Sequence, residues 1–156
     1  MPQYRHTQIG TLMLTLLGGA ILIVGVILLA RGWDSVLLLV LLVLVVTAGL
    51  FASLTVAIGD GVLTIWFGPG LIRKRVPLAA IHTCSVVRNP WWYGWGIRWT
   101  PHGWLYNVSG LAAVELTLTN GQQLRIGTDE PQRLCQAIAH ACTNVPLGSN
   151  RNEPAA

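Results

Sequence analysis

Residues 9 to 30 read IGTLMLTLLGGAILIVGVILLA, a run of 22 residues without a charged side chain. Residues 35 to 53 read SVLLLVLLVLVVTAGLFAS, a second uncharged run of 19. A helix of about 20 residues, rising about 1.5 Å per residue, crosses the roughly 30 Å hydrocarbon layer of a membrane and satisfies its own backbone hydrogen bonds. Neither run has the polar face of a helix in a soluble protein. The sequence therefore predicts a transmembrane helical hairpin, with helices at about 9 to 30 and 35 to 53.

A cleavable signal peptide is the alternative interpretation of the first run, because Arg5 precedes it. We favour a membrane span because the run is longer than the roughly 7 to 15 residues of a signal core and no small-residue cleavage site follows it. A second apolar run also begins almost at once. The residues between the runs, Arg31 to Asp34, form a tight turn in which Trp33 suits the membrane interface. The composition agrees, since 53% of residues are hydrophobic and only 10% are charged.

Basic residues indicate which side of the membrane holds the two ends of such a hairpin. Arg5 precedes the first run, and Arg73, Lys74 and Arg75 follow the second, whereas the connecting turn offers only Arg31. Cytoplasmic segments near spans carry an excess of Lys and Arg. We therefore expect a multi-pass protein of the cell inner membrane with its N- and C-termini in the cytoplasm.

From residue 54 to about 142 the pattern predicts a small domain of strands followed by one helix. Apolar residues alternate with polar ones, as in strands with one buried face, and Asp60-Gly61 and Asn120-Gly121 are typical of tight hairpins. A final helix begins near Thr128 or Asp129 and carries apolar residues at helical spacing. Residues 91 to 110 have no sustained period, so their strands are only loosely placed. The tail, residues 143 to 156, is predicted to be disordered. The expected strands lie at 54–58, 62–67, 72–76, 83–88, 114–118 and 124–126.

Three further stretches carry a resemblance to a known family. They are Gly94-Trp95-Gly96-Ile97-Arg98, Leu105-Tyr106-Asn107-Val108-Ser109-Gly110 and Arg125-Ile126-Gly127-Thr128-Asp129-Glu130-Pro131. Over residues 54 to about 142 the chain resembles small bacterial membrane proteins with a bacterial PH-like domain, and the helical hairpin ahead of it fits that architecture. The resemblance implies an α+β PH-like domain, an antiparallel, partly open barrel of six to seven strands capped by one C-terminal helix. It implies no catalytic residue and no inositide specificity.

Arg73, Lys74 and Arg75 are the densest charge in the sequence. Held close to a bilayer, they would meet anionic headgroups at about 1 kcal/mol per basic side chain. A solvated strand is the other interpretation. On a regular strand alternation sends Lys74 to the face opposite its two neighbours, so the three cannot share one patch.

An aromatic segment is the second candidate contact region. Trp and Tyr favour membrane interfaces and protein interfaces because an apolar ring carries a polar tip. Core and turn packing, interface anchoring and a partner surface all remain open for this segment. Its aromatic residues are Trp91, Trp92, Tyr93, Trp95, Trp99, Trp104 and Tyr106.

Nothing in the sequence indicates a metal, a cofactor or catalysis. Cys84, Cys135 and Cys142 form no CxxC pair and no even set. Cys84 lies near His82, but no acid is placed to orient such a pair. We therefore expect a protein without enzymatic activity, cofactor, metal or nucleic-acid partner.

The function predicted from these features is that of a membrane-anchored interaction module. Its expected partners are the bilayer, anionic lipid headgroups, another membrane protein or a second copy of the chain. An accessory subunit of a membrane enzyme or transporter complex is the alternative.

Overall fold

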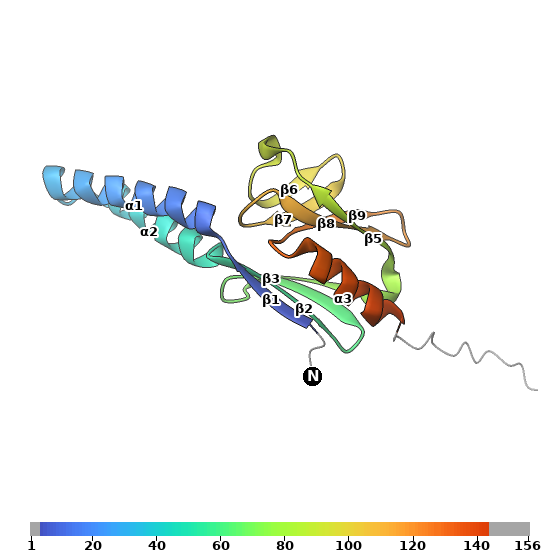
Figure 1. Ribbon diagram of the computed structural model, residues 1–156. Coiled ribbons are helices and arrows are strands. Elements are labelled where there is room, and N and C mark those ends of the chain that lie inside the picture. The colour runs from blue at the N-terminus through green and yellow to red at the C-terminus, as the bar shows by residue number, and fades with distance from the viewer. Residues whose placement is uncertain (1–3, 144–156) are drawn as a thin grey trace, which may run out of the picture.

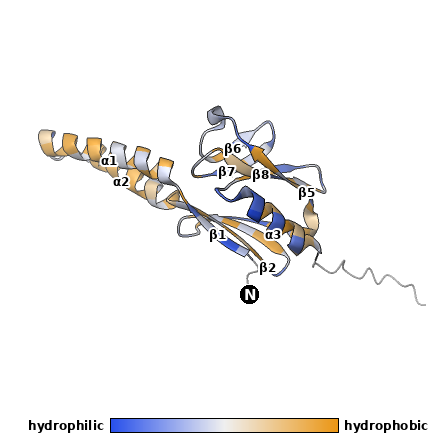
Figure 2. Ribbon diagram, in the orientation of Figure 1, coloured by the Kyte–Doolittle hydropathy of each residue, from blue (hydrophilic) through white to orange (hydrophobic). Residues whose placement is uncertain are grey.

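The computed structural model describes residues 4–143. Two helices, α1 (Thr11–Arg31) and α2 (Ser35–Leu50), lie side by side and project from the rest of the molecule as an apolar arm (Figure 1). Neither helix contains a buried residue, and both are mostly apolar, with paler turns toward the base of the arm (Figure 2). Asp34 caps α2, its carboxylate accepting hydrogen bonds from the backbone N–H groups of Val36 and Leu37. We call residues 11–50 the apolar arm.

The prediction of two membrane-spanning helices is wrong. Within residues 4–143, α1 is the one helix that is long and apolar enough for a membrane span or a signal sequence. The 16 residues of α2 give about 24 Å of helix against a layer of roughly 30 Å. The apolar run counted from the sequence includes Phe51, which no longer belongs to the helix. Its ring packs edge-on against Phe67 of the neighbouring sheet, with 5.3 Å between centroids.

The first sheet has four strands in the order β1-β2-β3-β4, all antiparallel. Strand β1 (Tyr4–Ile9) precedes the arm and β2 (Ser53–Gly59) follows it, yet the two pair along their length. Strands β3 (Val62–Phe67) and β4 (Ile72–Pro77) complete the sheet. As the sequence indicates, Asp60 and Gly61 both adopt positive φ in the β2–β3 turn, at 51° and 73°.

The second sheet has five strands in the order β5-β8-β9-β7-β6. Its neighbours are antiparallel except for β7 and β9, which run parallel. The turn η1 (Leu78–Ala80) leads into it from β4, η2 (Trp91–Tyr93) precedes β6, and α3 (Pro131–Thr143) ends the described chain. The strands are β5 (Ile81–Arg88), β6 (Gly96–Thr100), β7 (Gly103–Asn107), β8 (Ala112–Leu118) and β9 (Gln123–Gly127).

The core lies between the two sheets and α3, which contacts β5, β8, η1 and β2. Apolar side chains from both sheets and from the helix meet there, which is why the two halves of the chain form one unit. The largest of the fully buried side chains are Leu54, Ile58, Leu63, Ile65, Phe67, Leu78, Leu105, Val108, Leu116, Ile126, Leu134 and Ile138.

The predicted single PH-like barrel is also wrong. The expected strands and the final helix are present, but residues 4–143 form two separate sheets of four and five strands. Two features account for the difference. Strand β1, which precedes the apolar arm in the sequence, adds a fourth strand to the first sheet. Strands β6 and β7 lie within residues 91 to 110, where the sequence has no sustained period. The predicted disordered tail lies, beyond Thr143, outside the described residues.

Candidate functional site

The base of the apolar arm is joined to the first sheet without a flexible linker. Gly10 alone separates β1 from α1, and its N–H donates to the Ala52 carbonyl across the base at 2.8 Å. A Cβ on Gly10 would lie 2.8 Å from the Phe51 carbonyl oxygen, so only glycine fits this crossing without a shift. The direction of the arm is therefore tied to the direction of β1 and β2.

One face of the first sheet gathers arginine side chains from its two edge strands. The register places Arg5 opposite Ala57, Ala57 opposite Thr64, and Thr64 opposite Arg75. The neighbouring row brings Trp66 opposite Arg73. Because all of these residues share one side of the pleat, they form a single surface. We call Arg5, Trp66, Arg73 and Arg75 the basic face.

The contacts of the basic face leave its charge available. The three arginines are exposed, and the Arg5 guanidinium lies over the Trp66 ring, 5.6 Å from its centroid. The Arg73 Nε donates to the Gly70 carbonyl at 2.7 Å. None of the ion pairs found in residues 4–143 includes Arg5, Arg73 or Arg75. The face therefore presents three positive charges to an anion from outside the chain.

Only part of this face was identified from the sequence. The structure keeps Arg73 and Arg75 together and sends Lys74 to the opposite side of β4, as alternation requires. Arg5 and Trp66 were not selected as site residues. They join the face through β1–β2 and β3–β4 pairing, and the first of these pairings has no local signal in the sequence.

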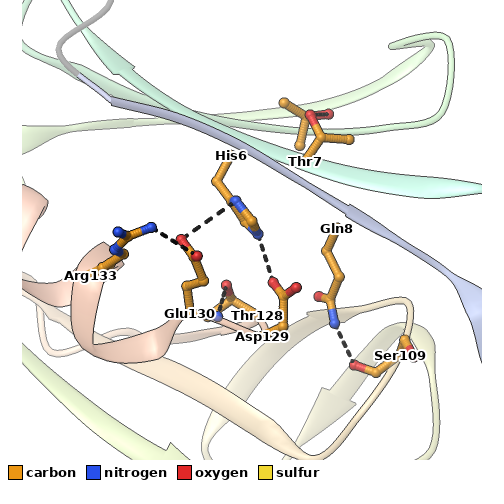
Figure 3. A network of polar contacts seen from close by, with 9 residues as sticks. His6, Thr7, Gln8, Ser109, Thr128, Asp129, Glu130 and Arg133 are labelled. Atoms are coloured by element: carbon orange, nitrogen blue, oxygen red, sulfur yellow. Dashed lines mark hydrogen bonds and ion pairs between the residues drawn. The ribbon is translucent and has the colours of Figure 1, made fainter.

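The other side of β1 holds the two halves of the domain together (Figure 3). His6 Nε2 lies 2.6 Å from Asp129 Oδ1, and Glu130 in turn accepts a hydrogen bond from Arg133 at 3.0 Å. Gln8, which is buried, donates to the Ser109 carbonyl at 3.1 Å. These residues, apart from Arg133, link the strand ahead of the arm to loops of the second sheet. We call the His6 and Gln8 contacts the β1 clasp.

A groove of about 490 Å³ lies beside the clasp, between β1 and α3. The Tyr4 hydroxyl is buried without a hydrogen-bond partner among the described residues. Burial raises the pKa of Tyr4, and the nearby Glu130 and Asp129 carboxylates raise it further, so the hydroxyl stays protonated at neutral pH. Arg133 on the groove wall is paired with Glu130, whereas Arg5, which also lines the groove, is in none of the ion pairs found in residues 4–143.

The aromatic segment does not form one cluster. Trp91 and Trp92 stack edge to face with 6.1 Å between centroids, and Trp99 and Trp104 form a second such pair at 5.3 Å on the β6–β7 hairpin. Trp91, Trp92 and Trp99 are about two-thirds or more exposed. Core packing therefore does not account for these three rings.

The remaining rings of the segment have different surroundings. The Tyr93 hydroxyl lies 3.2 Å from His102 Nδ1. Trp95 donates from Nε1 to the Gly110 carbonyl, and the adjacent Ser109 hydroxyl lies 3.0 Å from that of Thr11, the first residue of the arm. Trp95 is thus tied to a loop that contacts the base of the arm.

The cysteines lie partly buried against the core. Burial raises the pKa of the Cys84 thiol, and its contact with Cys135 raises it further. A thiol with a raised pKa is a poor nucleophile, because the thiolate is the reactive form. Among residues 4–143 no group of three or more His, Cys, Asp or Glu side chains is arranged to hold a metal ion.

Comparison with protein-family models, with curated proteins and with solved structures gives no match. The resemblance to bacterial PH-like membrane proteins therefore stays a prediction. The geometry of the apolar arm and of the basic face is the basis on which a function can be assigned to this chain.

Proposed function

We propose that this chain is a non-enzymatic, membrane-anchored module whose domain binds anionic lipid headgroups at the membrane surface. The observation that carries the proposal is the apolar arm, two helices that are apolar on all sides and contain no buried residue. Exposing that much apolar surface to water is strongly unfavourable, whereas lipid accepts it. The arm is thus suited to lie in a bilayer, with the domain directly at its base.

Strand β1 supports an anchor that is retained rather than a signal that is removed. Cleavage after α1 would detach β1 from the domain, and β1 is an edge strand of the first sheet and provides the β1 clasp. An intact mass that includes residues 4–9 is therefore expected for the mature protein.

Charge favours the cytoplasmic side of the cell inner membrane for the domain. Pairing of β1 with β2 keeps both strands at the same end of the arm, and the domain at that end carries Arg5, Arg73 and Arg75. At the far end of the arm, Arg31 is accompanied by Asp34. An excess of Lys and Arg marks the cytoplasmic side of membrane proteins.

The basic face lies within reach of headgroups. Along β2 the Trp66–Arg73 row is two residues from Ser53, about 7 Å at about 3.3 Å per residue, and the Arg5–Arg75 row is about 13 Å away. The surface potential of an anionic leaflet decays over a Debye length of about 8 Å at physiological salt. Arg73 is therefore placed to contribute most, and Arg5 and Arg75 less.

Lipid retained by the full-length chain tests this proposal. The chain is reconstituted in bilayers of anionic and zwitterionic phospholipid and extracted with a polymer that keeps surrounding lipid. We expect the retained lipid to be enriched in the anionic species. The enrichment should fall in Arg5→Gln/Arg73→Gln/Arg75→Gln and persist in Lys74→Gln/Arg88→Gln, where charge is removed elsewhere. Equal retention by all three chains would contradict headgroup binding by the basic face.

A protein partner is the second candidate, favoured by the Trp99–Trp104 pair. Trp99 is 71% exposed and Trp104 45% exposed on the edge hairpin of the second sheet, at the end distant from the Ser109 contact with the arm. Trp is enriched at the centres of protein interfaces. Under this proposal, cross-linking from position 99 in cells should capture a membrane protein. That cross-link should be lost in the Trp104→Ala variant, while the enrichment in anionic lipid stays unchanged.

A further inference from the structure

We propose that the β3–β4 turn, Gly68 to Leu71, inserts into the lipid beside the base of the apolar arm. We call these four residues the wedge turn. The inference rests on the proposed insertion of the arm and adds a second, non-helical point of membrane contact. It commits to lipid as the occupant because the turn adjoins the arm itself.

The unequal lengths of the two helices create room for the turn. At about 1.5 Å per residue, the 21 residues of α1 extend about 31 Å and the 16 of α2 about 24 Å. The first matches a hydrocarbon layer of roughly 30 Å, and the second falls short by about 7 Å. The Gly10 N–H donates to the Ala52 carbonyl, so the start of α1 lies level with Ala52, two residues beyond the end of α2 at Leu50. If α1 spans the layer, the stretch of membrane beyond Leu50 is filled by residues that follow α2 or pack on its end.

The wedge turn packs on that end. A Cβ on Gly68 would lie 2.5 Å from the Gly49 carbonyl oxygen and 2.7 Å from that of Leu50, so the two backbones are in close contact. The Gly68 N–H donates to the Ser53 carbonyl at 2.8 Å, and its φ of 44° also favours glycine. The last turn of α2 and the wedge turn therefore lie at the same depth.

The chemistry of the wedge turn suits the boundary between hydrocarbon and headgroups. Its residues are Gly68, Pro69, Gly70 and Leu71, none of them charged, and Leu71 is 80% exposed. Pro69 has no N–H, and the N–H of Gly70 donates to the Phe67 carbonyl at 2.8 Å. Few backbone donors are thus left without a partner, which lowers the cost of leaving water.

Arg73 marks the outer limit of this insertion. Arg73 lies two residues beyond Leu71, and its side chain folds back to the turn, where Nε donates to the Gly70 carbonyl. An arginine beside an inserted apolar residue keeps its charge at headgroup level while its stem covers apolar surface. The wedge turn and the basic face would then act together, the first in the acyl region and the second among phosphates.

The test measures depth at three positions of the full-length chain in liposomes. A fluorescent amino acid sensitive to polarity is incorporated at position 71, at position 22 in the middle of α1, or at position 120 in the β8–β9 turn. Leu71 and Leu22 are exposed and Asn120 lies in a turn, so the probe displaces no core residue. Lipids with a nitroxide at a shallow or a deep acyl position then quench the probes according to depth.

We expect a blue-shifted emission at position 71 that the shallow nitroxide quenches more than the deep one. Position 22 should show the reverse preference, and position 120 should be quenched by neither. If position 22 is quenched and position 71 behaves like position 120, the arm inserts and the wedge turn does not, which refutes this inference alone. If position 22 is not quenched either, the proposed membrane anchoring fails as well.

Discussion

Replacing the apolar arm by a two-residue loop should give a domain that folds in water. Ile9 and Ser53 are partners across the β1–β2 ladder, so Asn-Gly in place of residues 10–52 can close a tight hairpin between the two strands. The arm contains no buried residue, so its removal leaves the buried core side chains in place. The deletion also removes Phe51, whose ring packs on Phe67, and the comparison variant below lacks that ring as well. The informative comparison is with a second variant that lacks residues 1–52 and therefore also lacks β1.

The contribution of β1 can be estimated from its contacts. The His6–Asp129 contact is charge-assisted but leaves Asp129 57% exposed, so it contributes about 1 kcal/mol. The neutral hydrogen bond of buried Gln8 adds about 1 kcal/mol. Partial burial of the Tyr4 ring adds about another 1 kcal/mol. The ladder bonds roughly offset the entropy of ordering six residues, which leaves a total of about 3 kcal/mol.

Urea unfolding followed by tryptophan fluorescence measures this difference. With a denaturant dependence of about 2 kcal/mol per molar, the hairpin variant should unfold at a urea concentration about 1.5 M higher than the variant without β1. A matched hairpin variant with His6→Ala and Gln8→Ala keeps the strand but loses the β1 clasp, and its midpoint should fall between the two. Coinciding midpoints for all three would refute the conclusion that β1 belongs to the folded domain.

Three further outcomes are expected from individual side chains. In the hairpin variant, Arg73→Gln should weaken partitioning to anionic vesicles about fivefold, which corresponds to about 1 kcal/mol. Lys74→Gln, on the opposite face of β4, should have a smaller effect, and equal effects would show that only the net charge matters. Glu115→Gln should destabilise the domain by about 3 kcal/mol in urea unfolding, because it leaves the buried Arg125 without the carboxylate 2.6 Å away. An unchanged urea midpoint would show that the Glu115–Arg125 pair adds nothing to stability. Cys84 should be alkylated at least about tenfold more slowly in the folded than in the unfolded chain at pH 8. The reason is that its raised pKa lowers the thiolate fraction about tenfold for each pKa unit. Equal alkylation rates would contradict its burial.

Much of the secondary structure could be predicted because its signals are local. Alternation marked β2, β3, β8 and β9, and the Asp60-Gly61 and Asn120-Gly121 pairs marked their hairpins. Helical spacing of apolar residues marked α3. Each of these signals lies within the element it predicts, so no knowledge of distant contacts was required.

Strand β1 carries no such signal. The residues that it turns toward the second sheet, Tyr4, His6 and Gln8, are polar, so the segment lacks apolar alternation. Its pairing partner lies on the other side of a 40-residue arm and is identified only by the register. The same pairing brings Arg5 to the basic face, which is why only two of its three arginines could be found from the sequence.

The division into two sheets was also beyond local patterns. Consecutive strands favour antiparallel hairpins, whereas β7 runs parallel to β9, with β8 on the far side of β9. Gly103 allows the tight β6–β7 turn through a φ of 83°, in a segment whose many rings hide its alternation. The length of α2 was overestimated because hydropathy does not distinguish the last helical residues from Phe51, which packs on the sheet.

Extraction of the full-length chain from cell membranes tests the role of the apolar arm most directly. Membranes from cells that express it are washed with alkaline carbonate and then with mild detergent, alongside cells that express the hairpin variant. We expect the full-length chain to stay with the membrane until detergent is added, and the hairpin variant to be found in the soluble fraction. Release of the full-length chain by carbonate as a monodisperse protein would contradict an arm that lies in lipid.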